Sequence, residues 1–240
     1  MLVLGKLKGL LGALKFLAFF KTGASLLLFV LIEAWAFGWP SAVVITVLLV
    51  TMSLGRLLAL KLQRRQATPM IFIPFLGGGA GAKTRGEIAT QDAFVSIMGP
   101  VFGAGSALVC VGLYLRSDSQ FWLVMASLAF MLNLFQLLPA PGLAGGSIAL
   151  LISPKLLLPG IAVLLLVGWQ SVLVWFIALM ALPYAFMMWK AKPSDDPYLA
   201  RVTSADRWKY GLSLLAIALV LGLGNRFCDD RLHELRQFLG

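Results

Sequence analysis

The chain is poor in charge and in side chains that bind metals. Of its 240 residues 12% are charged, and it contains one histidine, His233, and two cysteines, Cys110 and Cys228. A soluble domain carries about 25% charged residues, so this composition excludes an ordinary soluble domain. Two cysteines, one in an apolar run and one near the C-terminus, do not form a disulfide framework. The single histidine, close to the end of the chain, leaves the rest of the sequence without a histidine ligand or catalytic base.

Hydrophobic residues make up 60% of the chain, and the mean hydropathy is +0.92. This composition predicts an all-α, polytopic membrane protein with about six to seven transmembrane helices. The apolar runs that predict these helices cover residues 22–37, 40–60, 93–115, 121–138, 156–169, 171–189 and 210–223. The fifth and seventh runs are short for a hydrocarbon core of about 30 Å.

The basic residues give an orientation. The chain has 20 lysines and arginines and a net charge of +10. If the N-terminus is cytoplasmic, most of these residues fall in cytoplasmic segments, as the positive-inside rule requires. We therefore expect a multi-pass protein of a plasma membrane with a cytoplasmic N-terminus. Nucleic-acid binding is not expected, because none of its sequence signatures is present.

The two ends of the chain differ from the apolar runs. Residues 1–21 carry four lysines spread among leucine and phenylalanine. This pattern is typical of an amphipathic segment on the inner membrane surface, and equally of a basic segment that leads into the first span. Residues 225–240 place Leu232, Leu235 and Leu239 at helical spacing, which predicts an amphipathic C-terminal tail.

A short segment follows the second run and is unlike a helix. Residues 69–76 are apolar but contain Pro69 and Pro74, so they predict a membrane-dipping strand, loop or hairpin. The glycine-rich residues that come next, Gly77 and Gly78 among them, predict a flexible loop at the membrane surface.

Two stretches carry a resemblance to a known family. The first is Met52-Ser53-Leu54-Gly55-Arg56, and the second runs from Asn133 through Pro139-Ala140-Pro141-Gly142-Leu143-Ala144-Gly145-Gly146. They resemble the HExxH and NxxPxPxLDGG motifs of the site-2 protease family, the zinc-dependent intramembrane proteases. The resemblance extends from about residue 34 to 148, with the matching features in the same order as in that family. It includes the loop 73–77, Gly99-Pro100 and Gly103. It implies a site-2-protease-like core within residues 22–153, additional transmembrane helices in 154–224, and a bacterial inner membrane.

The residues that would bind zinc are replaced. The two histidine positions of the first motif hold Met52 and Arg56, the glutamate position holds Ser53, and the aspartate position of the second motif holds Ala144. Arginine is permanently charged and repels Zn²⁺ at close range. Ser53 has neither histidine nor lysine in its span to act as a base. We therefore expect no zinc, no other cofactor and no enzymatic activity. The residues that give the fold its shape remain, and Gly99, Gly103 and Gly105 are expected to let helices approach closely.

Five residues are candidates for client or partner contacts: Asn133, Arg56, Glu33, Gly77 and Gly78. In active relatives the asparagine is thought to hold substrate, but here we favour a polar hydrogen bond between helices. Glu33 and Arg56 differ in predicted depth by roughly 15 Å, so they are not expected to pair. Arg56 is expected to extend to the inner interface, or to meet an anionic group of a partner or lipid.

The sequence thus predicts a pseudoprotease that acts through binding to integral membrane proteins and the lipid bilayer. Our preferred hypothesis is a structural or assembly subunit of a hetero-oligomeric inner-membrane complex. One alternative is a pseudoprotease that binds or chaperones transmembrane clients without cleaving them. Another is an enzyme of this family that retains residual activity.

Overall fold

The computed structural model describes residues 22–239, with gaps at 74–76, 80, 168–171 and 191–193. The basic N-terminal segment 1–21 lies outside the described residues. The described chain is mainly helical. Its elements are a first helix Thr22–Phe37, α2 (Trp39–Leu62), β1 (Ile71–Ile73), β2 (Gly77–Gly79), α3 (Ala89–Ser117), α4 (Gln120–Gln136), α5 (Ala144–Ile152), the 3₁₀ turn η1 (Pro154–Leu156), α6 (Leu157–Val167), α7 (Val172–Lys190), α8 (Pro197–Ala200) and α9 (Ser204–Leu239).

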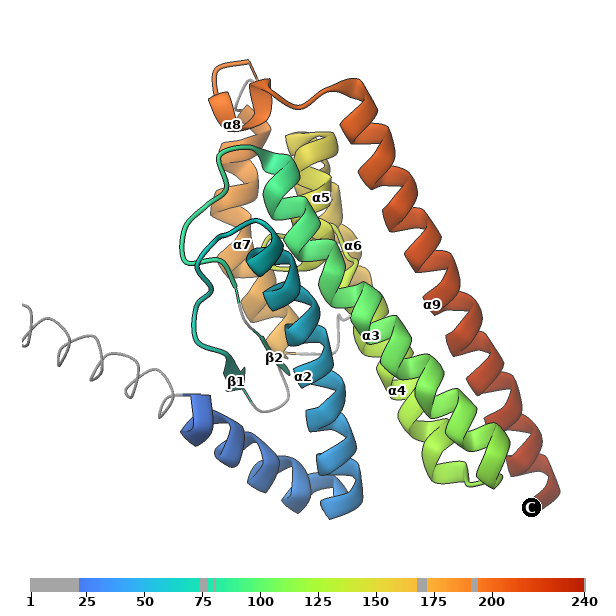
Figure 1. Cartoon of the computed structure of the whole chain (residues 1–240). Helices are drawn as coiled ribbons and strands as arrows, with labels where there is room; N and C mark the ends of the chain where they lie inside the picture. Colours follow the sequence, from blue (N-terminus) through green and yellow to red (C-terminus); the bar gives the residue numbers. More distant parts are fainter. Residues whose placement is uncertain (1–21, 74–76, 80, 168–171, 191–193, 240) are drawn as a thin grey trace, which may run out of the picture.

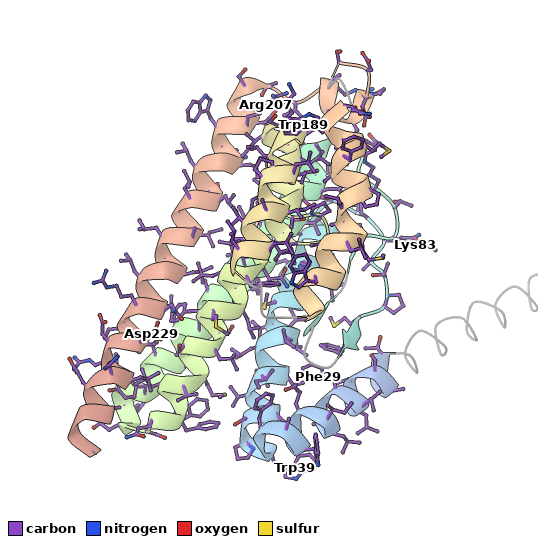
Figure 2. All side chains as sticks on the ribbon, turned by 180° about the vertical axis from the view of Figure 1, so that it is seen from behind. Phe29, Trp39, Lys83, Trp189, Arg207 and Asp229 are labelled. Carbon is purple, nitrogen blue, oxygen red and sulfur yellow. The ribbon has the colours of Figure 1, made fainter. Side chains whose placement is uncertain are left out.

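Helices α2, α3 and α4 form the centre of the bundle, and α9 runs along its outside against α4 (Figure 1). The chain turns sharply between the first helix and α2 at Gly38, which has φ 81°, a conformation that glycine adopts without strain. Trp39 lies at one end of the bundle, while Trp189 and Arg207 lie at the opposite end (Figure 2). Aromatic residues at both ends of an apolar bundle are typical of a membrane protein.

Three of the described helices are long and apolar enough to cross a membrane: α2, α3 and the part Ser204–Leu235 of α9. Six to seven were expected, so the structure supports a membrane protein with fewer such helices. The helices Thr22–Phe37, Gln120–Gln136 and Pro154–Leu166 are apolar but have only 10–17 residues. At 1.5 Å per residue, 17 residues span about 25 Å, which is less than a bilayer core of about 30 Å.

The C-terminal region differs from the expected span 210–223 followed by a separate tail. Helix α9 continues for 36 residues without a break. Neither Gly222 nor Gly224 has a positive φ, and the sequence has no proline between 204 and 239. The missing side chain of Gly224 leaves room for the ring of Phe130 on α4. The expected tail is therefore the end of a long helix that packs against the bundle.

Of the strand, loop or hairpin expected after the second span, the structure shows a hairpin. β1 and β2 form an antiparallel hairpin in which Phe72 faces Gly78. The Phe72 side chain is buried, and its ring lies 6.0 Å from that of Phe29 on the first helix. The expectation of a flexible glycine loop is wrong for Gly77 and Gly78, because both are paired in β2.

Glycines bring the central helices into close contact, as predicted for Gly99 and Gly103. A Cβ on Gly99 would lie 2.7 Å from Nε of Arg56 on α2, and one on Gly103 would overlap the Asn133 amide of α4. Gly55 of α2 packs equally closely against the backbone of Met98. Gly105 does not share this role, since a Cβ there would meet nothing within 4 Å. It lies on an exposed face of α3, away from these contacts.

Candidate functional site

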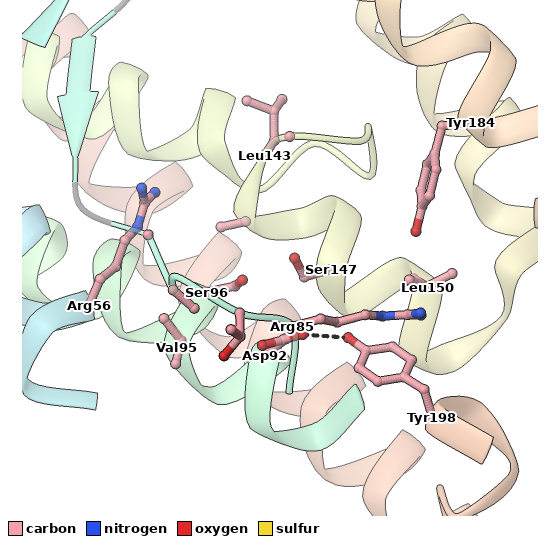
Figure 3. Close-up of a pocket in the computed structure, with 15 residues that line it drawn as sticks. Arg56, Arg85, Asp92, Val95, Ser96, Leu143, Ser147, Leu150, Tyr184 and Tyr198 are labelled. Atoms are coloured by element: carbon pink, nitrogen blue, oxygen red, sulfur yellow. Dashed lines mark hydrogen bonds between the residues drawn. The ribbon is translucent and has the colours of Figure 1, made fainter. Parts of the chain in front are cut away.

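A cavity of about 400 Å³ opens among α2, α3, α5, α7 and α8 (Figure 3). Its lining is mixed in character, with guanidinium groups, hydroxyl groups and apolar side chains. The lining residues are Arg56, Gly81, Ala82, Thr84, Arg85, Asp92, Val95, Ser96, Gly142, Leu143, Ala144, Ser147, Leu150, Tyr184 and Tyr198. Its lining is more polar than that of the second cavity, which lies around Glu33, and we take it as the candidate site.

The cavity brings together two of the four positions where the resemblance places zinc-binding or catalytic residues. Arg56 reaches it from α2, and Ala144 reaches it from the first turn of α5. The turn before α5 depends on Gly142, which has φ 90° and also lines the cavity. The second sequence motif therefore lies next to α2, the helix that carries the first motif.

The other two positions do not line this cavity. Met52 is 4% exposed and belongs to a hydrophobic cluster with Leu49 and Phe130. Ser53 is buried, and its Oγ donates to the carbonyl of Leu49, one turn earlier, at 2.9 Å. A serine hydroxyl used in this way satisfies its own helix, so Ser53 is placed as a packing residue.

Arg56 does not extend to the membrane interface as expected. Its Nη2 donates to Oε1 of Gln136 on α4 at 3.0 Å. Its Nε is buried and has no hydrogen-bond partner among the described residues. The close approach of Gly99 fixes the side chain in this direction. A permanently charged guanidinium is thus held across the bundle with a neutral amide as its hydrogen-bond partner.

Asp92, at the start of α3, joins three parts of the chain next to the cavity. It accepts from Arg65 of the loop after α2 at 2.7 Å, from the hydroxyl of Tyr198 at 2.8 Å, and from the backbone N–H of Gly86. Burial and the neighbouring Asp92 carboxylate raise the pKa of Tyr198, so this hydroxyl remains a donor. Arg85 lies 3.5 Å above the Tyr198 ring and 3.3 Å from a carboxylate oxygen of Asp196.

Sequence reasoning missed this cluster. Asp92 precedes the third apolar run, and Tyr198 lies between the sixth and seventh runs, where no functional residue was expected. The available signal was the position of Asp92 in the first turn of a helix, where a carboxylate is favourable and accepts backbone N–H groups. Nothing in the spacing of Arg65, Arg85 and Tyr198 indicates that they meet there.

Asn133 is buried at 2% exposure but does not form the expected bond between helices. Its Nδ2 donates to the carbonyl of Ala129, in its own helix, at 2.8 Å. Its Oδ1 has no partner among the described residues. The amide instead packs into the space that Gly103 leaves on α3. Helices α3 and α4 therefore meet here by close packing and without a hydrogen bond from Asn133, because the glycine on α3 leaves room for the asparagine on α4.

Glu33 lines a different cavity of about 430 Å³, which lies among the first helix, α2 and α4. The residue is 3% exposed and is surrounded mainly by apolar side chains such as Phe29, Ile45 and Leu128. Arg56 and Glu33 thus belong to separate cavities. Any client or partner contact through both residues would have to reach two places in the bundle.

Gly77 and Gly78 lie on the inner strand of the hairpin. β2 packs beside α2, and β1 forms the outer strand (Figure 1). The N–H of Phe72 in β1 donates to Oγ of Ser25 on the first helix at 3.3 Å. The first helix therefore occupies part of the free edge of this small sheet.

Hydrogen-bond donors predominate among the side chains that line the cavity, and its Asp92 carboxylate is already engaged by Arg65 and Tyr198. Within the described residues, no group of three or more His, Cys, Asp or Glu side chains is placed to hold a metal ion. Comparisons of the chain with protein-family models, with curated proteins and with solved structures each give no match.

Proposed function

We propose that the chain is a pseudoprotease: a relative of the site-2 proteases that has lost its zinc ligands and serves as a non-catalytic subunit of an inner-membrane protein complex. The observation that carries the proposal is the meeting of Arg56 and Ala144 in one cavity. The two residues come from separate motifs and occupy positions that the resemblance assigns to one zinc site. That positions 56 and 144 share a cavity supports the alignment of the two motifs, although positions 52 and 53 are packed outside it.

The substitutions at these positions explain why we propose binding rather than catalysis. A zinc protease needs ligands around the metal and a carboxylate that activates the bound water. Arg56 brings a positive charge to this place, and Ala144 brings only a methyl group. The glycines that hold the helices together are retained, and Gly99 accommodates the Arg56 side chain. The scaffold is thus adapted to the arginine.

A subunit also needs a surface for its partners, and α9 offers one. Trp208, Leu212, Leu215 and Leu219 recur at helical spacing and are 58–71% exposed. One face of α9 packs against the bundle, and side chains on its opposite face project away from the other helices (Figure 2). An apolar stripe on an outer helix fits a transmembrane helix of a partner or the lipid acyl chains.

The client-binding alternative is favoured by one observation, the apolar cavity around Glu33. The mainly apolar walls of this cavity suit the apolar face of a client helix. Addition of a client strand to the hairpin is less well supported, because Ser25 already meets the outer strand.

The test is a pull-down of the tagged full chain from native membranes in mild detergent, with the molar ratio of each co-purifying protein. A partner set near unit stoichiometry supports the subunit proposal. A range of substoichiometric single-span proteins supports client binding instead. Recovery of the chain alone contradicts both.

A matched pair of variants sharpens this test. Leu215→Ala together with Leu219→Ala shortens the α9 stripe, whereas Leu108→Ala changes an exposed leucine on α3. If α9 is the docking surface, the first variant loses its partners and the second retains them. Equal recovery with both variants would remove α9 from the proposal.

A further inference from the structure

The cavity in Figure 3 has an excess of positive charge that the chain does not balance. All ten Asp and Glu residues lie in the described part of the chain. Within that part, Arg56 makes a hydrogen bond to the neutral Gln136 and no ion pair. Removing a charge from water without an opposite charge is costly, so a guanidinium in this setting favours an external anion.

The first turn of α5 faces the same cavity. Leu143, Ala144 and Ser147 all line it, and α5 has no side-chain cap at its N-terminus. The first N–H groups of a helix and the positive end of its dipole favour an anion. Gly142 and Ala144, on either side of the N-cap residue Leu143, are small residues that also line the cavity.

The other lining groups are mostly donors. Thr84, Ser96 and Ser147 contribute hydroxyls. Arg85 also lines the cavity, but its guanidinium already pairs with Asp196 at 3.3 Å, so Arg56 is the arginine without an opposite charge among the described lining residues. Asp92 is the exception, but its charge is compensated by Arg65 at 2.7 Å. Arginine, hydroxyls and a helix N-terminus together are the donor set that phosphate groups prefer in proteins.

We propose that this cavity binds a phosphate-bearing anion between the Arg56 guanidinium and the N-terminus of α5. The volume of about 400 Å³ accommodates a phospholipid headgroup or a small free phosphate compound. Both sources present the same chemistry to the cavity. The inference rests on the geometry of Arg56 and α5 and does not depend on the function proposed above.

The experiment uses the full chain in maltoside detergent, which contains no phosphate. The midpoint of thermal unfolding is titrated with phosphatidylglycerol, with inorganic phosphate, and with uncharged diacylglycerol as a control. A saturable rise with phosphatidylglycerol alone assigns the site to a lipid headgroup, and a rise with inorganic phosphate assigns it to a free anion. No rise with either probe, or an equal rise with diacylglycerol, overturns the proposal.

Variants locate the site. Arg56→Gln should weaken the apparent affinity at least about tenfold, as expected when a charge-assisted bond is lost. Arg201→Gln makes the same change of charge at an exposed arginine near α8 and should leave the affinity unchanged. Equal affinities in the two variants would overturn the proposal.

A second substitution keeps the test decisive if Arg56→Gln does not fold. Ala144→Asp places a carboxylate at the N-terminus of α5, inside the same cavity. This internal anion should raise the unfolding midpoint in the absence of added phosphate and abolish the response to the probe. A wild-type response in Ala144→Asp would contradict the assigned position.

Discussion

Replacing Gly103 with alanine should destabilise the protein through one neighbour, the Asn133 amide. The added methyl group would overlap Oδ1 and Cγ of Asn133, and this side chain is buried on α4 with no free space around it. The α3 backbone is close to α4 at this point, so neither helix can yield without disturbing its other contacts. Asn133→Ala should relieve the overlap and restore much of the lost stability.

The magnitudes follow from packing and hydrogen bonding. An extra methyl group in a filled core costs about 1–3 kcal/mol. Asn133→Ala removes the bond to Ala129, worth about 1 kcal/mol, but also removes an unpartnered buried oxygen whose cost is about 1–3 kcal/mol. The single variant Asn133→Ala should therefore lie within about 1 kcal/mol of the wild type. The two substitutions should couple by about 1–3 kcal/mol in the favourable direction.

The assay is reversible unfolding in mixed micelles of mild detergent and dodecyl sulfate, applied to the wild type, both single variants and the double variant. Gly105→Ala is the matched control, because a Cβ at this exposed position of the same helix meets nothing within 4 Å. It should gain up to about 1 kcal/mol from helix propensity. Additive effects of Gly103→Ala and Asn133→Ala, or equal effects of Gly103→Ala and Gly105→Ala, would refute the packing argument.

Three further predictions concern the inner cluster and the α5 turn. Asp92→Asn should lower the free energy of unfolding by about 2 kcal/mol, because Arg65 loses a charged acceptor; an unchanged chemical unfolding curve would contradict this. The raised pKa of Tyr198 means that the unfolded chain deprotonates first, so stability should fall as the pH rises above about 10. Tyr198→Phe should flatten this fall, and identical pH profiles would refute it. Gly146→Ala should overlap the Ala140 carbonyl and lower the melting temperature, whereas Gly112→Ala, which meets nothing, should not.

Much of the fold's centre could be predicted from the sequence, because its signals are local. The two prolines within residues 69–76 argued against a helix and for a strand, loop or hairpin, and β1 lies there. Gly99 and Gly103 indicated close helix contacts, and both contacts are present. Such residues act on their own backbone or on the helix directly opposite, so pattern alone identifies them.

The rest depended on contacts that a pattern does not contain. The span count was too high because apolarity shows that a run is buried in protein or lipid, and it does not distinguish the two. The break at Gly224 did not occur because Phe130 of α4 fills the space beside it. Arg56 points inward because Gly99 makes room and Gln136 supplies an acceptor, and neither is near it in sequence.

The candidate site was likewise predicted in part from the sequence, and the rest of it depended on tertiary contacts. The two motifs predicted that Arg56 and Ala144 belong to one place, and both line one cavity. The cluster of Asp92, Arg65 and Tyr198 was not predicted, because it joins α3, α8 and the loop after α2, whose approach is set by the packing of the helices. The contacts proposed at Gly77 and Gly78 were placed on a loop that the structure shows as a paired strand.

The most direct test of the central claim is to restore the missing ligands. A variant with Met52→His, Ser53→Glu, Arg56→His and Ala144→Asp is purified, checked for its helical content and unfolding midpoint, and analysed for bound zinc. If the two motifs form a degenerate zinc site, the folded variant should retain about one zinc ion per chain, and the wild type should retain none. A well-folded variant that retains no zinc would contradict the claim that these four positions once formed a single site.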